Sequence, residues 1–115
     1  RSAIKSQFNT TKANQTEALL NYQKTILNGY IEVSNEVSNV KNLNELYELK
    51  NKEVSSYTQS TEIANDLFKS GRATYLEVLL AQRTALDSKI ELIITKKLQH
   101  QAIINLYKAL GGGIN

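Results

Sequence analysis

The middle of the chain reads Phe68-Lys69-Ser70-Gly71-Arg72-Ala73-Thr74-Tyr75-Leu76-Glu77-Val78-Leu79-Leu80, followed by Ala81-Gln82. Gly71 interrupts a long stretch in which apolar residues recur with helical spacing. Glycine readily adopts the left-handed backbone conformation that commonly ends a helix. Thr74 and Glu77 have the three-residue spacing of a capping box at the start of another helix. The segment therefore predicts two helices joined by a tight turn at residues 70–74, which we call the tip.

Apolar residues recur at alternating spacings of three and four on both sides of the tip, the pattern of a heptad seam. We expect a first helix over about residues 3–69, a second over about residues 74–110, and a glycine-rich end at 111–115. Each expected helix carries two seams. Those of the first helix are Ile26, Tyr30, Val33, Val37, Val40, Tyr47 and Leu27, Ile31, Leu43, Leu46, Leu49, and those of the second are Leu76, Leu79, Leu86, Ile90, Ile93, Ile104, Tyr107 and Leu80, Leu98, Ile103, Leu106, Leu110.

The predicted fold class is all-α, a long antiparallel helical hairpin of the coiled-coil type. A simple hairpin needs one buried stripe per helix, so two stripes predict neighbours on both sides, as in a bundle or a closed helical barrel. The first helix is the longer one, and its early apolar residues, such as Leu19 and Ile26, need cover from another copy or from further sequence. Polar residues such as Asn44 interrupt the seams, and two interpretations stay open: they fix the register, or one face lines water.

Composition excludes several function classes. The 115 residues allow at most one domain, 41% of them are hydrophobic, and the net charge is +3. There is no cysteine, so there is no disulfide framework and no thiol chemistry. The densest basic spot, Lys96-Lys97 with His100, lacks the arginine clustering and interleaved aromatics of a nucleic-acid surface. No apolar run approaches the ~20 residues that a membrane-spanning helix needs.

Sequence motifs for catalysis and metal binding are missing as well. His100 has no carboxylate three or four residues away, so no helical ligand set for a metal is present. We find no nucleophile–base pair, no phosphate-binding glycine loop and no carboxylate dyad. We therefore expect a protein that is not an enzyme and that uses no cofactor.

The tip and the end of the chain resemble TolC-like outer-membrane efflux proteins. The family's tip pattern is an aromatic residue, a glycine and then Tyr-Leu-x-Val-Leu-x-Ala-Gln. The end, Leu106-Tyr107-Lys108-Ala109-Leu110-Gly111-Gly112-Gly113, is similar to the Leu-Tyr-x-Ala-Leu-Gly-Gly-Gly that closes the family's last long helix. The start, Ala3-Ile4-Lys5 with Ala13 and Tyr30-x-Glu32-Val33, is similar to the beginning of the family's longest helix. The matching tip positions are Phe68, Gly71, Tyr75, Leu76, Val78, Leu79, Ala81 and Gln82.

Two positions depart from the family. Ile114 stands where a tryptophan usually follows the three glycines, and Leu80 stands where a second polar or acidic residue commonly follows Glu77. A gate made of two acidic rings is therefore not expected in this chain.

The resemblance implies a specific place in a larger assembly. Such proteins are trimers in which each chain contributes four β-strands to an outer-membrane barrel and long helices to a periplasmic tunnel. This chain, which lacks the β-strand sequence and an initiator methionine, would be the second periplasmic hairpin of a longer protein. Its function would be passive export through a tripartite efflux pump, with the tip docked to a periplasmic adaptor and, through the adaptor, to an inner-membrane pump.

The same resemblance assigns roles to the tip residues. Glu77 is the candidate for a pore gate, because three copies around a three-fold axis form an anionic ring that favours cations. Simpler roles stay open: Glu77 as a capping carboxylate, Gly71 as a turn residue, Tyr75 and Leu76 as local packing, and Arg72 as a solvated charge. The residues implied to contact the adaptor are Gly71, Arg72, Ala73, Thr74, Tyr75 and Leu76.

A structural module is the alternative function. An antiparallel coiled coil that dimerises or binds another protein explains the heptad seams equally well, but it does not explain the tip pattern. In either case we expect the isolated chain to associate with itself through its apolar N-terminal segment.

Overall fold

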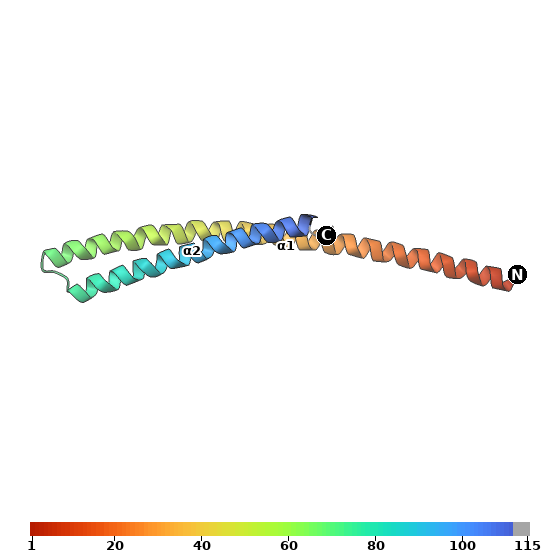
Figure 1. Cartoon of the computed structure of the whole chain (residues 1–115), viewed down its shortest axis with the longest axis horizontal. Coiled ribbons are helices and arrows are strands. Elements are labelled where there is room, and N and C mark those ends of the chain that lie inside the picture. The colour runs from red at the N-terminus through yellow and green to blue at the C-terminus, as the bar shows by residue number, and fades with distance from the viewer. Residues whose placement is uncertain (112–115) are drawn as a thin grey trace. The chain divides into compact units, whose positions relative to one another are not determined.

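The computed structural model describes residues 1–111. Helix α1 spans Ser2–Lys69 and helix α2 spans Tyr75–Gly111 (Figure 1). The expected helices were residues 3–69 and 74–110, and of the expected glycine-rich end only Gly111 lies within the described residues, as the last residue of α2. The all-helical hairpin is confirmed. Within residues 1–111, neither helix has a stretch with the length and hydropathy needed to cross a bilayer.

The described residues form two units, which divide between Asn35 and Glu36. The first unit is a single helical segment, the beginning of α1, in which every side chain is exposed except the half-buried Val33. The large apolar side chains of this unit are exposed as well: Leu19 is 56% exposed, Ile26 55% and Tyr30 71%. A helix in water gains most of its stability from tertiary packing of such a face, which this unit by itself does not provide.

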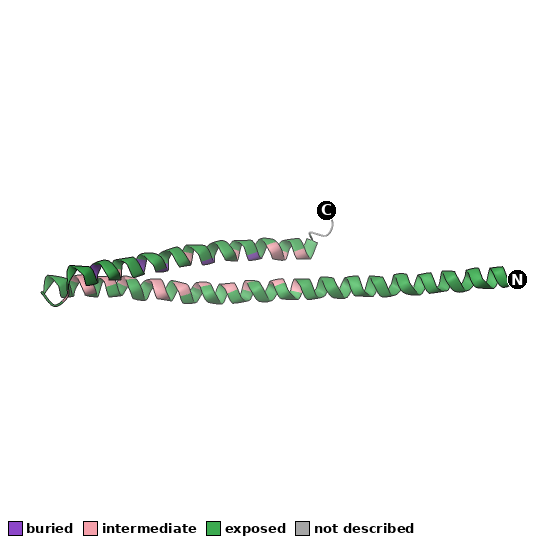
Figure 2. Cartoon of the chain, turned by 90° about the horizontal axis from the view of Figure 1, so that it is seen from below, coloured by how far each residue is buried: buried purple, intermediate pink, exposed green. Residues whose placement is uncertain are grey.

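The second unit is the hairpin. Residues 36–69 of α1 and the whole of α2 run antiparallel, with their partly buried residues along the facing sides (Figure 2). Among residues 1–111 the fully buried ones all belong to α2, and four of these five are small: Val78, Ala85, Ser88, Thr95 and Ala102. The half-buried residues Ala81, Leu92, Gln99, Leu106 and Ala109 complete a regular three-four series on α2. Facing them on α1 are the half-buried Val40, Leu43, Tyr47, Lys50, Val54, Thr61 and Ala64.

The two seams expected in the second helix are not the residues through which α2 packs against α1. Their large apolar members are exposed, and those of the first seam range from 42% at Leu79 to 72% at Tyr107. In the second seam only Leu106 is half-buried, and the other four are exposed. Short side chains such as Ala85, Ser88 and Ala102 occupy the line along which α2 meets α1, so the contact within the chain uses neither of the two expected seams as a whole. The large side chains of α2 remain available for other neighbours.

Three polar contacts join the helices in the half of the hairpin away from the tip. Lys50 Nζ donates a hydrogen bond to Glu91 Oε2 at 3.0 Å, and this bond is the main cause that raises the pKa of Lys50 above its ordinary value. Gln99 Nε2 donates to Asn44 Oδ1 at 2.9 Å. The Lys96 ammonium lies 4.9 Å from the centre of the Tyr47 ring, a cation–π distance. At Asn44 the contact favours register control over a face that lines water.

Candidate functional site at the hairpin tip

The end of α1 is a Schellman motif. Gly71 has a φ of 76°, in the left-handed region, and its N–H donates to Phe68 O at 3.0 Å. The Arg72 N–H donates to Leu67 O at 2.8 Å, which completes the paired hydrogen bonds of the motif. The chain therefore turns at a fixed angle, and Gly71 is the residue that permits the turn.

The beginning of α2 is a capping box. Thr74 N–H donates to Glu77 Oε2 at 2.9 Å, and Glu77 N–H donates to Thr74 Oγ1 at 3.3 Å. These reciprocal bonds satisfy backbone donors that the first turn of a helix otherwise leaves free. The Glu77 carboxylate also lies at the positive end of the helix dipole. Glu77 is nevertheless exposed, so its capping role leaves the carboxylate accessible to solvent.

An aromatic pair joins the two helices beside the turn. The ring centres of Phe68 and Tyr75 lie 5.6 Å apart with a 54° angle between the ring planes, a favourable tilted geometry. One turn further into the hairpin, Val78 is only 2% exposed. Tyr75 is thus fixed by local packing although 59% of its surface is exposed.

The tip presents a mixed surface on a rigid turn. Gly71, Arg72, Thr74, Tyr75 and Leu76 are exposed, and Ala73 is half-buried. In residues 1–111 Arg72 forms no ion pair within the chain. A guanidinium, a phenol and a leucine side chain are therefore available together for a partner. Within the described part of the chain, residues 1–111, no group of three or more histidine, cysteine or carboxylate side chains could hold a metal.

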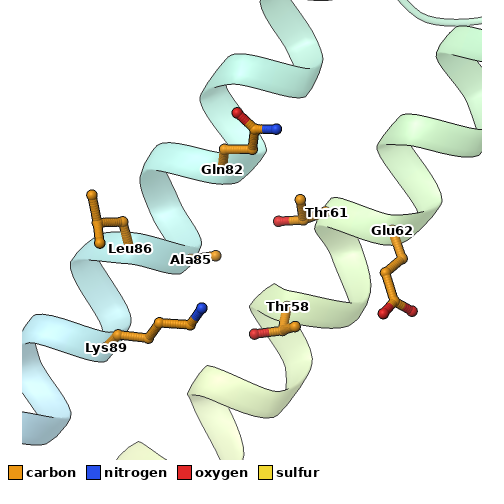
Figure 3. Close-up of a pocket in the computed structure, with 7 residues that line it drawn as sticks. All are labelled: Thr58, Thr61, Glu62, Gln82, Ala85, Leu86 and Lys89. Carbon is orange, nitrogen blue, oxygen red and sulfur yellow. The ribbon is translucent and has the colours of Figure 1, made fainter.

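A groove lies between the helices behind the tip, and the sequence interpretation did not identify it. The residues that line it are Thr58, Thr61 and Glu62 on α1 and Gln82, Ala85, Leu86 and Lys89 on α2. Figure 3 shows Thr61 and Ala85 pointing between the helices, while Glu62 and Leu86 border the groove with their side chains directed outward. The space measures about 280 Å³. Thr61 Oγ1 also donates to Ala81 O at 3.2 Å across the interface. The sequence signal for this groove was Ala85, whose short side chain leaves room between the helices.

Comparison with known proteins identifies the family. Residues 1–112 match the family described as outer membrane efflux protein, which is nearly the whole chain. The chain belongs to the outer membrane efflux protein family. The resemblance to TolC-like proteins, and with it the location at the outer membrane, is therefore confirmed.

Individual members of the outer membrane efflux protein family match almost the full chain. It is 27% identical over 113 residues to the pyoverdine export outer membrane protein OpmQ of Pseudomonas aeruginosa, covering 96% of this chain and 23% of that protein. It is 29% identical over 99 residues to the cation efflux system protein CusC of Escherichia coli K12, covering 86% and 22%. It is 26% identical over 109 residues to the probable outer membrane lipoprotein SilC of Salmonella typhimurium, covering 95% and 24%. The chain thus spans about a quarter of the length of these relatives, and no solved structure matches it.

Proposed function

We propose that the chain is a periplasmic tunnel segment of an outer-membrane efflux channel and that it acts as a passive conduit, not as an enzyme. Membership of the efflux family supports this function. The relatives' names include pyoverdine export and cation efflux, two unlike cargoes. A hairpin shared by both is better suited to lining a path than to recognising one cargo.

The observation that carries the proposal is the second apolar face of α2. Leu86, Ile90 and Ile93 are exposed, and each precedes a packed residue by two positions, at Ser88, Leu92 and Thr95. Two residues correspond to about 200° around a helix, so these side chains lie opposite the hairpin contact. The same spacing holds for Leu76, Leu79, Ile104 and Tyr107. A helix that is apolar on two opposite sides fits a wall of helices with a neighbour on each side.

Assembly into a trimer would cover this face. Exposed apolar patches that extend along a whole helix are uncommon on monomeric proteins, and they mark interaction surfaces. In the proposed trimer, α2 packs on α1 through its small residues and on another helix of the assembly through Leu86, Ile90 and Ile93. The simpler coiled-coil module would also cover the face, but it does not account for family membership.

The tip is proposed to dock onto a periplasmic adaptor. Arg72, Tyr75 and Leu76 offer a charge, a hydrogen-bonding phenol and an apolar group on a turn that is fixed by the Schellman motif, the capping box and the aromatic pair. Gly71, Ala73 and Thr74 would complete the contact through the backbone and short side chains. Preorganised surfaces of this kind lose little conformational entropy on binding. Through the adaptor, the channel would connect to an inner-membrane pump.

The assembly is tested with a charged substitution on the exposed face of α2. In the full-length parent protein, Ile93→Asp should reduce the trimer to monomers, because it buries an unpaired charge between subunits. In the 115-residue chain the same change should leave the melting temperature almost unchanged, since Ile93 is 68% exposed there. Native mass spectrometry and circular dichroism measure the two effects. A parent protein that stays trimeric with Ile93→Asp would contradict the proposed packing, and Glu48→Asp on the charged face of α1 is the control.

Glu77 is proposed to form an anionic ring in the trimer, and two substitutions separate this function from capping. Glu77→Gln keeps a capping-box side chain at this position but removes the charge. We expect it to weaken block of the reconstituted channel by cations while the thermal stability of the hairpin is retained. Glu77→Ala should change both. Planar-bilayer recording is the measurement, and unchanged cation block with Glu77→Gln would remove Glu77 from the gate.

A further inference from the structure

The polar side of the first unit carries a regular row of neutral amides. Gln7, Asn14, Asn21, Asn28 and Asn35 are spaced seven residues apart, and all five are exposed in helix α1. A seven-residue repeat stays on one side of a helix that supercoils to the left, with successive members about 10.5 Å apart. We call these five residues the amide row.

The amide row lies opposite the apolar side of the same unit. Asn21 follows Leu19 by two residues, Asn28 follows Ile26, and Asn35 follows Val33, which places each amide about 200° from an apolar neighbour. If Leu19, Ile26 and Val33 are the residues that neighbouring helices cover, the amides point away from those helices. Leu27 and Ile31 of the second seam border the row on one flank, about 60–100° around the helix from Asn28. With both seams covered, the row still faces open water, either inside or outside the assembly.

An ordinary solvated helix face has a different composition. In residues 36–69 of α1 the seven-residue series continues only to Asn42 and then reaches Leu49, and the exposed side carries charges at Lys41, Glu45, Glu48 and Lys52. Lysine and glutamate are good helix formers, whereas asparagine costs about 0.6 kcal/mol more per helix position. Solvation alone therefore does not explain a helix that repeats asparagine at this spacing. The repeat is better explained by a need for uncharged groups that both donate and accept hydrogen bonds.

We propose that the amide row is the face of α1 that lines the conduit, an inference that rests on the proposed function. Each amide offers two hydrogen-bond donors and one acceptor oxygen, so it can hydrogen-bond to polar solutes of either charge. It adds no fixed charge that would hold an ion in place, and conduction requires that solutes bind weakly enough to leave. The proposed cargo class for this part of the conduit is accordingly polar solutes of either sign, without selection by charge.

The test adds charge to the row in the reconstituted full-length trimer. Asn21→Asp combined with Asn28→Asp places six carboxylates along the conduit, two from each of three subunits, and should shift the reversal potential in a potassium chloride gradient toward that of potassium. Low salt is required, because exposed charges are screened beyond about 10 Å at 0.1 M ionic strength. The matched control is Gln23→Glu, an exposed amide two residues after Asn21 and therefore on the side of Leu19 and Ile26. Because neighbouring helices are expected to cover that side, native mass spectrometry must first show that the control is still a trimer.

The outcomes separate the amide row from the conduit itself. A shift with the row variant and none with Gln23→Glu supports the inference. A shift with Gln23→Glu alone, with both variants, or with neither overturns the assignment of the face while the conduit stands. A wild-type parent that conducts no ions removes the proposed function, and this inference with it. Should the aspartates impair assembly, Asn21→Cys modified after reconstitution by a cationic thiol reagent must lower single-channel conductance, and Gln23→Cys must not.

Discussion

The two helices of the hairpin contribute to their contact in different ways. α2 supplies all of the fully buried residues and α1 supplies none. The side chains that α2 places in the contact are mainly short, such as Ala85 and Ala102, while α1 covers them with larger, half-buried groups such as Tyr47 and Val54. The hairpin is therefore held by the fit of large side chains on one helix over small ones on the other, and the largest apolar residues of α2 take no part in it.

The outer sides of the two helices differ as well. Away from the contact, residues 36–69 of α1 carry charges at Lys41, Glu45 and Glu48 beside a few exposed apolar residues such as Ile63, whereas α2 carries mainly large apolar side chains such as Leu86 and Ile93. The small stripe of α2 and the large stripe behind it thus serve two different contacts. This division predicts which substitutions affect the hairpin alone and which affect the assembly.

The largest expected effect comes from filling the small stripe. Ala102 is 1% exposed, so Ala102→Leu inserts three carbon atoms where two helices touch and should lower the free energy of unfolding by about 1–3 kcal/mol. Ala18→Leu, at an exposed position of α1, is the matched control and should change it by less than about 0.5 kcal/mol. Urea unfolding of the dilute chain followed by circular dichroism measures both. Equal effects at the two positions would show that the small stripe is not the contact.

The pattern of these contacts explains what the sequence could and could not predict. The turn was predictable because Gly71, Thr74 and Glu77 act through local backbone hydrogen bonds, which depend on spacing alone. The stripe that packs inside the hairpin was not, because large apolar side chains dominate a periodicity whichever neighbour they contact. Leu86 and Ala85 are adjacent in sequence, and only the structure separates the face used within the chain from the face left exposed. The roles of the tip residues and of Glu77 stay predictions.

The next effect contrasts Gly29, which lies within α1, with Gly71, which lies in the tip. Gly71→Ala places a side chain at a φ of 76° and should destabilise the hairpin by about 1–2 kcal/mol. Gly29 is helical with open space around its Cα, so Gly29→Ala should instead raise helix stability by about 0.5–1 kcal/mol. Thermal unfolding and helical content report the two effects. Two changes of the same sign would mean that Gly71 does not determine the turn.

The smallest effect concerns the Lys50–Glu91 pair, in which Lys50 is half-buried and Glu91 exposed, and which lies away from the tip. Because the folded state raises the pKa of Lys50, the pair stabilises the hairpin at pH values below the ordinary lysine pKa, and this contribution is lost as pH rises through the higher folded pKa. Lys50→Met should therefore destabilise the chain at neutral pH, and its difference from wild type should shrink at strongly alkaline pH or in high salt. Lys52→Met controls for the ionisation of other groups. A difference that stays constant across this range would mean that Lys50 acts through the packing of its aliphatic stem and not through its charge.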